Sequence, residues 1–201
     1  MRYALKFIFL LTIALPSVVA MPVAAQTLID SPEGPWSHVD TGLQFPAMIG
    51  EFERGQIVEY DDAGRDASVG YHYIDDNGRL TVTLYTYPNW PELTCAQIFD
   101  DTSNVVLKYR GIRKLSEGKK ASPDGSVENA AHLRRYAIPE GSAGPDIPEL
   151  ISDLYLFCPA SGKWLVKYRA SWTGSEDTFP DMEQFLNKFE WPDALSGEAR
   201  P

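Results

Sequence analysis

The stretch from Leu154 to Trp172 constrains the fold most strongly. Two apolar runs flank a Pro-Ala-Ser-Gly break at residues 159–162, which is typical of a β-hairpin. In the second run, Lys167 and Arg169 alternate with apolar and aromatic residues, and this pattern predicts a strand with one buried face and one cationic face. The apolar set consists of Trp164, Val166, Tyr168, Ala170 and Trp172. Because an isolated hairpin is only marginally stable, further strands and helices must cover those aromatic rings.

A second hairpin is predicted for residues 66–75 and 79–87, around Asp76-Asn77-Gly78. The Asn-Gly pair favours a type I′ turn, which would place Tyr71 opposite Leu84 and Gly70 opposite Tyr85. One face of this hairpin is then apolar, and the other carries His72 and hydroxyl side chains.

Three further strands are predicted at residues 51–61, 112–121 and 129–138. Gly55 suggests a bulge in the first of them. The last two strands are rich in Lys and Arg, so we expect them at the outer part of the sheet, where charges prevent edge-to-edge association.

Two amphipathic helices are predicted, at residues 90–110 and 178–190, from apolar residues at helical spacing. Asn89 is the expected N-cap of the first helix, and Gly111 the expected stop. The second helix is expected to begin in the Thr178-Phe179-Pro180-Asp181 segment and to end before Pro192. The predicted class is therefore α+β: an antiparallel β-sheet of about six to seven strands packed with two amphipathic helices.

Residues 1–25 have the features of a secretory signal peptide. Arg2 and Lys6 precede an almost entirely apolar run, which ends in small residues before Gln26. Cleavage is expected after Ala25, which places the protein in the periplasm or outside the cell; an uncleaved membrane anchor is the alternative. We expect residues 26–41 to form an irregular arm, 42–192 a single domain and 193–201 a disordered tail.

The charge of the chain argues against nucleic acid as a partner. It carries 18 basic and 28 acidic residues, a net charge of −10, and removal of Arg2 and Lys6 would lower this by two, to −12. Such acidity is also unfavourable for anionic membrane surfaces.

The two cysteines, Cys95 and Cys158, both lie in the part expected to be exported. An even number of cysteines in an oxidising compartment predicts one disulfide, and the alternative is two separate buried thiols. Neither cysteine belongs to a Cys-x-x-Cys pair, so a redox-active role is not indicated.

The chain resembles small exported bacterial proteins of the PsbP-like α/β/α sandwich type. The resemblance covers most of residues 43–190. It rests on Phe45-Pro46-x-x-Ile49-Gly50-x-Phe52, on Gly70-Tyr71 followed by Thr81-Val82-Thr83-Leu84-Tyr85, and on Trp164-Leu165-Val166-Lys167-Tyr168-Arg169. These features concern the fold. The resemblance implies a non-enzymatic protein that binds partners, and it transfers no catalytic residue.

Motifs for catalysis or cofactor binding are absent from the sequence. There is no Gly-x-Gly-x-x-Gly, Walker loop, Gly-x-Ser-x-Gly or His-Glu-x-x-His. The three histidines, His38, His72 and His132, are far apart and show no metal-ligand spacing. We therefore expect no cofactor and no metal.

One surface is a candidate for binding. His72, Thr83 and Tyr85 share a face of one predicted hairpin, and Lys167 and Arg169 share the cationic face of the other. In a common sheet they would form a basic, hydroxyl-rich patch, with Arg169 able to hold an anion through two hydrogen bonds. The alternative is that helix acids, namely Asp100, Asp101 or Glu183, neutralise these bases.

Three classes of function are consistent with these features. The first is a non-enzymatic binding or accessory domain of the cell envelope, whose partner is an envelope protein or a small anionic ligand. The second is a small periplasmic hydrolase using His72, which would need a nucleophile and an orienting acid within hydrogen-bond reach. The third is a purely structural envelope protein.

Overall fold

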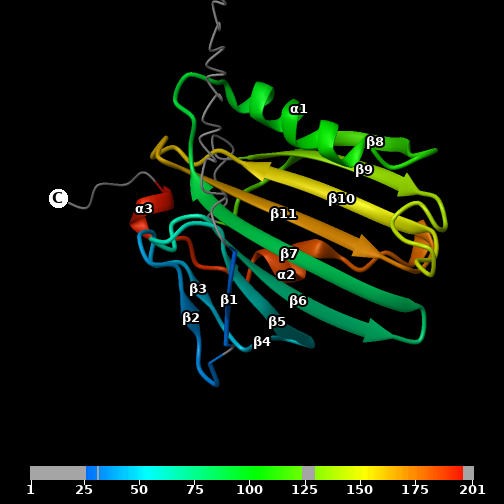
Figure 1. The fold of residues 1–201 in the computed structure, drawn as a ribbon, viewed down its shortest axis with the longest axis horizontal. Helices are drawn as coiled ribbons and strands as arrows, with labels where there is room; N and C mark the ends of the chain where they lie inside the picture. Colours follow the sequence, from blue (N-terminus) through cyan, green and yellow to red (C-terminus); the bar gives the residue numbers. More distant parts are fainter. Residues whose placement is uncertain (1–25, 31, 124–129, 197–201) are drawn as a thin grey trace, which may run out of the picture.

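The structure is a computed structural model that describes residues 26–30, 32–123 and 130–196. Its main element is one antiparallel sheet of nine strands in the order β1-β5-β6-β7-β11-β10-β9-β8, with β4 added on β5 (Figure 1). The strands of this sheet are β1 (Thr27–Ile29), β4 (Met48–Ile49), β5 (Phe52–Glu59), β6 (Ala67–Asp75), β7 (Gly78–Pro88), β8 (Arg113–Lys120), β9 (Ala131–Ile138), β10 (Leu150–Phe157) and β11 (Trp164–Trp172). β2 (Trp36–Ser37) and β3 (Gln44–Phe45) pair separately.

The predicted antiparallel sheet is confirmed, and the helical part is smaller than predicted. Only α1 (Cys95–Val106), a 3-10 turn (Glu176–Thr178), α2 (Met182–Leu186) and α3 (Asp193–Ser196) are helical among the described residues. The fold is therefore sheet-rich, and its two larger helices have 12 and five residues.

Capping explains why α1 is shorter than the predicted 90–110. Thr94 accepts a hydrogen bond from the backbone N–H of Gln97, whose side chain accepts one from the backbone N–H of Thr94. This capping box starts the helix five residues later than the expected cap, Asn89. The side chain of Asn89 instead donates to the Gly162 carbonyl.

The predicted helix at 178–190 is likewise wrong in extent. Asp181 caps α2 by accepting from the N–H of Glu183, and the helix ends at Leu186 with Asn187 as its C-cap. Further differences occur in the two terminal segments. Part of the predicted irregular arm forms β1 and β2, and the predicted tail begins with α3, in which Leu195 is fully buried. The predicted signal peptide, residues 1–25, and residues 197–201 lie outside the described residues.

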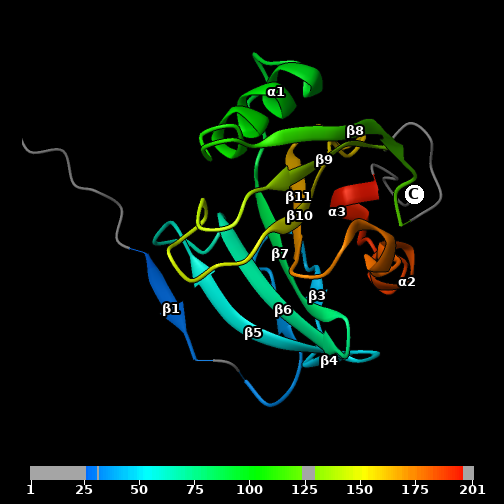
Figure 2. The same cartoon turned by 90° about the vertical axis from the view of Figure 1, so that its right-hand side faces the viewer.

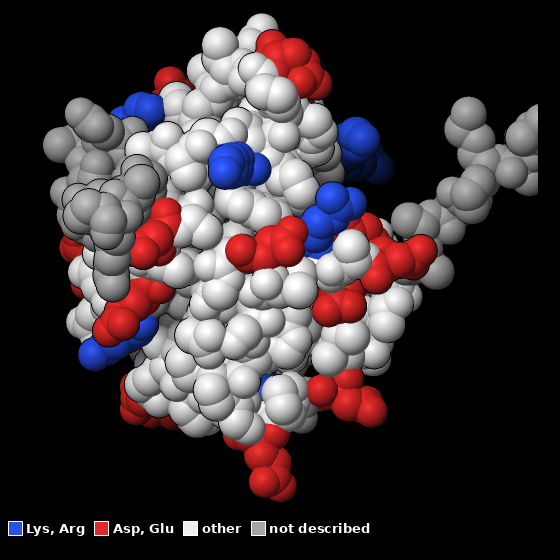
Figure 3. All heavy atoms as spheres, turned by 90° about the vertical axis from the view of Figure 1, so that its left-hand side faces the viewer, with Lys and Arg blue, Asp and Glu red and all other residues white. Residues whose placement is uncertain are grey.

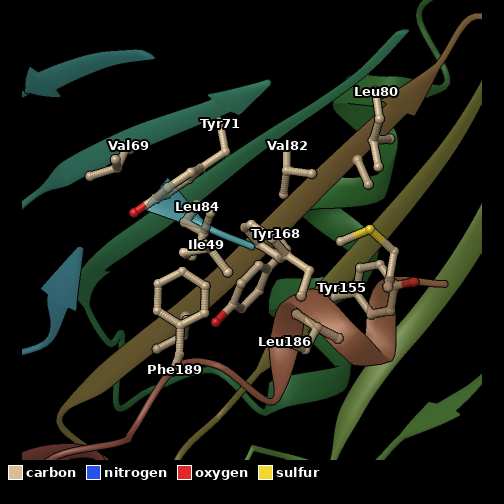
Figure 4. Close-up of a cluster of buried hydrophobic side chains, with 14 of the residues drawn as sticks. Ile49, Val69, Tyr71, Leu80, Val82, Leu84, Tyr155, Tyr168, Leu186 and Phe189 are labelled. Atoms are coloured by element: carbon tan, nitrogen blue, oxygen red, sulfur yellow. The ribbon is translucent and has the colours of Figure 1, made fainter. Parts of the chain in front are cut away.

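The two faces of the sheet carry separate cores. One core contains the fully buried Tyr71 and Tyr168 together with Leu186 of α2 (Figure 4). Trp172 and Phe185 belong to the same core. The other lies beneath α1, where Ile98 and Phe99 pack against apolar side chains of β9, β10 and β11. Figure 2 shows α2 and α3 on one side of the curved sheet and α1 on the other. The predicted alternation of β11 is therefore confirmed.

The β6–β7 hairpin has a different register from the predicted one. Asp75 pairs with Gly78, so Asp76 and Asn77 form the turn; Tyr71 faces Val82, and Gly70 faces Thr83. No described non-glycine residue has a positive φ, which excludes the predicted type I′ turn. The Asp75 carboxylate accepts from the N–H groups of Asn77 and Gly78 at 2.8 and 3.0 Å, and thereby stabilises the turn.

The error in register amounts to two residues, so every side chain stays on its predicted face. Gly78 is needed for a different reason from the one expected. A Cβ at this position would lie 2.8 Å from the backbone nitrogen of Gly174, which packs against the turn. The bulge predicted near Gly55 is present, because the β5–β6 register shifts between Arg54 and Ile57. The basic strand β8 lies at the edge of the sheet, as expected.

The predicted disulfide between Cys95 and Cys158 is present, with the two Cα atoms 6.0 Å apart. It joins the first residue of α1 to the residue that follows β10. Because α1 is short, this bond is a principal constraint on where the helix lies over the sheet.

Replacing both cysteines, Cys95→Ala with Cys158→Ala, should lower the free energy of unfolding by about 4 kcal/mol, the chain-entropy value for a closed loop of this length. Urea denaturation followed by circular dichroism measures this change. Wild-type protein reduced with dithiothreitol is the control and should unfold at the same urea concentration as the variant. An unchanged midpoint in the variant would contradict the proposed role of the bond.

Candidate functional site

A cavity lies beside α1, on the face of the sheet opposite α2. Its volume is about 370 Å³. Tyr85, Tyr87, Lys167 and Arg169 line it from β7 and β11, and the other lining residues come from α1, the loop before α1, β10 and the β5–β6 connection. The size is within the range of small-molecule sites.

Strand pairing positions the basic side chains of this cavity. Lys167 lies directly opposite Tyr85, and Arg169 lies opposite Thr83 in the β11–β7 ladder. Residues paired across adjacent strands project from the same face of a sheet. Since Tyr168 must point into the core below, its neighbours Lys167 and Arg169 must point towards the cavity side.

Lys167 is held over aromatic rings. Its Nζ lies 3.7 Å from the ring centroid of Tyr85 and 5.6 Å from that of Tyr87. Burial lowers the pKa of Lys167 to about 8; the charge of Asp66 opposes this change, and the charge of Arg169 adds to it. Within the described part of the chain, the ammonium group forms no salt bridge and no hydrogen bond.

Arg169 is only partly satisfied by protein groups. Its Nη2 donates to the hydroxyl of Tyr109 at 3.1 Å, and its guanidinium carbon lies 5.3 Å from the centroid of that ring. Its Nε is buried without a hydrogen-bond partner. A buried donor without a partner costs free energy, and an anionic ligand would remove this cost.

The wall formed by the β5–β6 connection contributes Tyr60 and Asp66. The N–H of Tyr60 donates to the Asp66 carbonyl at 2.7 Å, which brings the two residues together. The Tyr60 ring stacks on Tyr85 with centroids 6.4 Å apart. Burial, followed by the charge of Asp61, raises the pKa of Asp66, and Lys167 opposes this change. Asp66 is thus the single acid in a lining that holds two bases.

The rim of the cavity is apolar. Trp90, in the loop before α1, is 46% exposed, and Val105 of α1 is 59% exposed. Neither residue was predicted from the sequence to be part of a site. For Trp90, the available signal was an indole in a polar loop, between Asn89 and Pro91, which is typical of an exposed aromatic group.

The helix acids do not neutralise this site. Asp100 pairs with Arg134 at 2.7 Å, and Glu183 pairs with Lys120 at 3.0 Å. Elsewhere the surface carries many acidic side chains, as the face in Figure 3 shows, in keeping with the net charge of −10. The cavity is therefore a basic site in an acidic protein.

The other residues of the predicted patch lie outside this cavity. Thr83 is adjacent to Arg169 but does not line the cavity, and His72 borders a separate hollow with residues of β1 and β5. His72 Nδ1 lies 3.4 Å from Thr81 Oγ1, and within the described residues this is its only hydrogen-bond contact. The structure thus brings together Tyr85, Lys167 and Arg169. Glu53 lies opposite His72 in the β5–β6 ladder, but no carboxylate of the described residues forms a hydrogen bond with His72 of the kind a catalytic triad requires.

No cluster of three or more His, Cys, Asp or Glu side chains in the described residues has the arrangement of a metal site. In the same residues, no helix has the length and apolar character needed to cross a bilayer.

Comparisons with known proteins return no matching family model and no matching curated protein. The resemblance to PsbP-like proteins therefore remains a prediction. The function must therefore be inferred from the residues of the site.

Replacing each of the two charged neighbours of Lys167 should change the pKa of this lysine, in opposite directions for the two replacements. Arg169→Gln should raise the value above about 8, because it removes a repelling cation, and Asp66→Asn should lower it. NMR titration of the ¹³Cε signal, assigned with Lys167→Arg, measures both shifts. An ordinary lysine value near 10.5 in the wild type would contradict the described burial.

Proposed function

We propose that this chain is a non-enzymatic binding domain of the cell envelope, and that it takes a small anionic ligand in the cavity beside α1. The observation that supports the proposal is a pair of basic side chains that form no salt bridge within the described residues, set among aromatic rings in a concave site. A carboxylate satisfies the geometry of Arg169, which has planar donors suited to two parallel hydrogen bonds.

The apolar rim indicates what the rest of the ligand is like. Trp90 and Val105 expose apolar surface beside the two bases, and Tyr60 and Tyr87 add aromatic rings to the lining. Rings of this kind stack on flat apolar groups. The class of ligand that fits is a small carboxylic acid with an aromatic or planar apolar body.

The disulfide and the export signal expected at residues 1–25 support a periplasmic or secreted location. The accessory role is also what the PsbP-like resemblance implies. The hydrolase hypothesis gains no support from His72, which lacks an orienting acid in the described structure.

Binding of 3-phenylpropanoate tests the proposal. The wild type should bind it, with a change in tryptophan fluorescence because Trp90 lies at the rim. Arg169→Gln should weaken binding by roughly ten- to one-hundred-fold, the effect of losing a charge-assisted hydrogen bond of about 1.5–3 kcal/mol. Isothermal titration calorimetry provides the affinities.

Two controls make this test specific. Lys163→Gln removes an exposed cation next to β11 that does not line the cavity, and it should leave the affinity nearly unchanged. The methyl ester of the acid should bind much more weakly than the acid itself. Equal affinity for acid and ester, or equal affinity of wild type and Arg169→Gln, would rule out an anion site.

A further inference from the structure

The amine of Lys167 is placed unusually for a lysine that only contributes charge. It lies within the cavity, 3.7 Å from the Tyr85 ring centroid, and no oxygen of the described protein accepts a hydrogen bond from it. Lysines that pack against aromatic rings on a surface generally keep the ammonium group in water. Here the strand directs the amine to the place where a ligand would lie.

Two groups beside the amine complete a reactive arrangement. Arg169 follows two positions later on the same strand face, about 7 Å along the strand, within reach of a second part of one small molecule. Asp66 lines the same cavity from the facing connection and is its one carboxyl group. The cavity therefore holds an amine, an anion-binding guanidinium and an acid.

We infer that Lys167 forms a reversible imine with the carbonyl group of a 2-oxo acid, whose carboxylate is bound by Arg169. The inference rests on the proposed function, since it assigns the ligand of the same cavity to a narrower chemical class. A 2-oxo acid places its carbonyl carbon next to its carboxylate, and an aromatic 2-oxo acid adds the planar body that the rim favours.

The chemical step is balanced within this site. The neutral amine adds to the carbonyl carbon, and a proton moves from nitrogen to the former carbonyl oxygen. Asp66, in its acid form, donates a proton to that hydroxyl group, which leaves as water. The C–O bond breaks as the C=N bond forms, which leaves a protonated imine and the Asp66 carboxylate. No oxidant or further reactant is needed.

Burial favours the neutral amine that this step requires. With its pKa lowered to about 8, Lys167 supplies far more neutral amine near neutral pH than an ordinary lysine does. Burial also raises the pKa of Asp66, and the charge of Lys167 opposes this rise.

Reductive trapping with phenylpyruvate and sodium cyanoborohydride tests the inference on the full exported chain with its disulfide intact. We expect one adduct, with a mass increase equal to that of the acid less one oxygen atom, and peptide mapping should place it on Lys167. Labelling of Lys167 should exceed that of the exposed Lys163 on the order of tenfold or more, because of its larger neutral fraction. Without the reductant, no stable adduct should remain.

Matched variants and probes distinguish imine formation by Lys167 from carboxylate binding by Arg169. Lys167→Arg keeps the charge and should lose the adduct, and Lys163→Arg, outside the cavity, should keep both the adduct and the binding of 3-phenylpropanoate. Arg169→Gln should slow trapping of phenylpyruvate by about tenfold more than it slows trapping of phenylacetaldehyde, which has no carboxylate, because the rise in the pKa of Lys167 slows both.

The outcomes are distinguishable. If the wild type binds 3-phenylpropanoate but Lys167 is labelled no faster than Lys163, the inference is wrong and the proposed function stands. If neither acid binds, the proposed function fails together with the inference. If Arg169→Gln slows acid and aldehyde equally, the assignment to 2-oxo acids is wrong.

Discussion

The pairing of β11 with β7 at the middle of the sheet is the interaction on which the rest of the structure depends. The nine paired positions from Trp164 to Trp172 fix which side chains face each core. Tyr168, Ala170 and Trp172 are fully buried on the side of α2. Because side chains alternate along a strand, this burial sends Lys167 and Arg169 to the other face. The cationic site is thus a geometric consequence of the way the main core is built.

The small helical layer explains why a cavity exists at that face. α1 has only 12 residues, and it packs over β9, β10 and β11 without covering all of β7. The disulfide from Cys95 to the end of β10 holds the helix in this position. The uncovered part of the sheet is lined by tyrosines and by the two bases, and it becomes a cavity because α1 and the β5–β6 connection form its walls.

The parts of the fold and of the site that depend on the alternation of side chains along a strand were predictable from the sequence. Period-two patterns identified the strands, the faces of Lys167 and Arg169, and the basic edge strand β8. The parts that depend on competition between nearby groups were not. Thr94 and Gln97 form a better capping box than Asn89 can, and the Asp75 side chain sets the hairpin turn in place of Asn-Gly. Trp90 and Asp66 reach the cavity only through tertiary packing, which no local pattern reveals.

The hydrogen-bond partners of other basic side chains in the fold support a ligand for this site. Arg135 is held by the fully buried Asp153 through two hydrogen bonds of 2.7 and 2.8 Å, and Tyr155 donates a third to the same carboxylate. Arg54, which is buried, donates to the backbone carbonyls of Phe45 and Gly34. Both arginines thus have protein oxygens as hydrogen-bond acceptors. Lys167 has no such partner, and its lowered pKa means that the folded state disfavours the ammonium form below about pH 8, a cost that disappears as the pH rises towards 10.5. A methionine at this position would avoid the cost, so a residue that reduces stability is best explained by what the cavity binds.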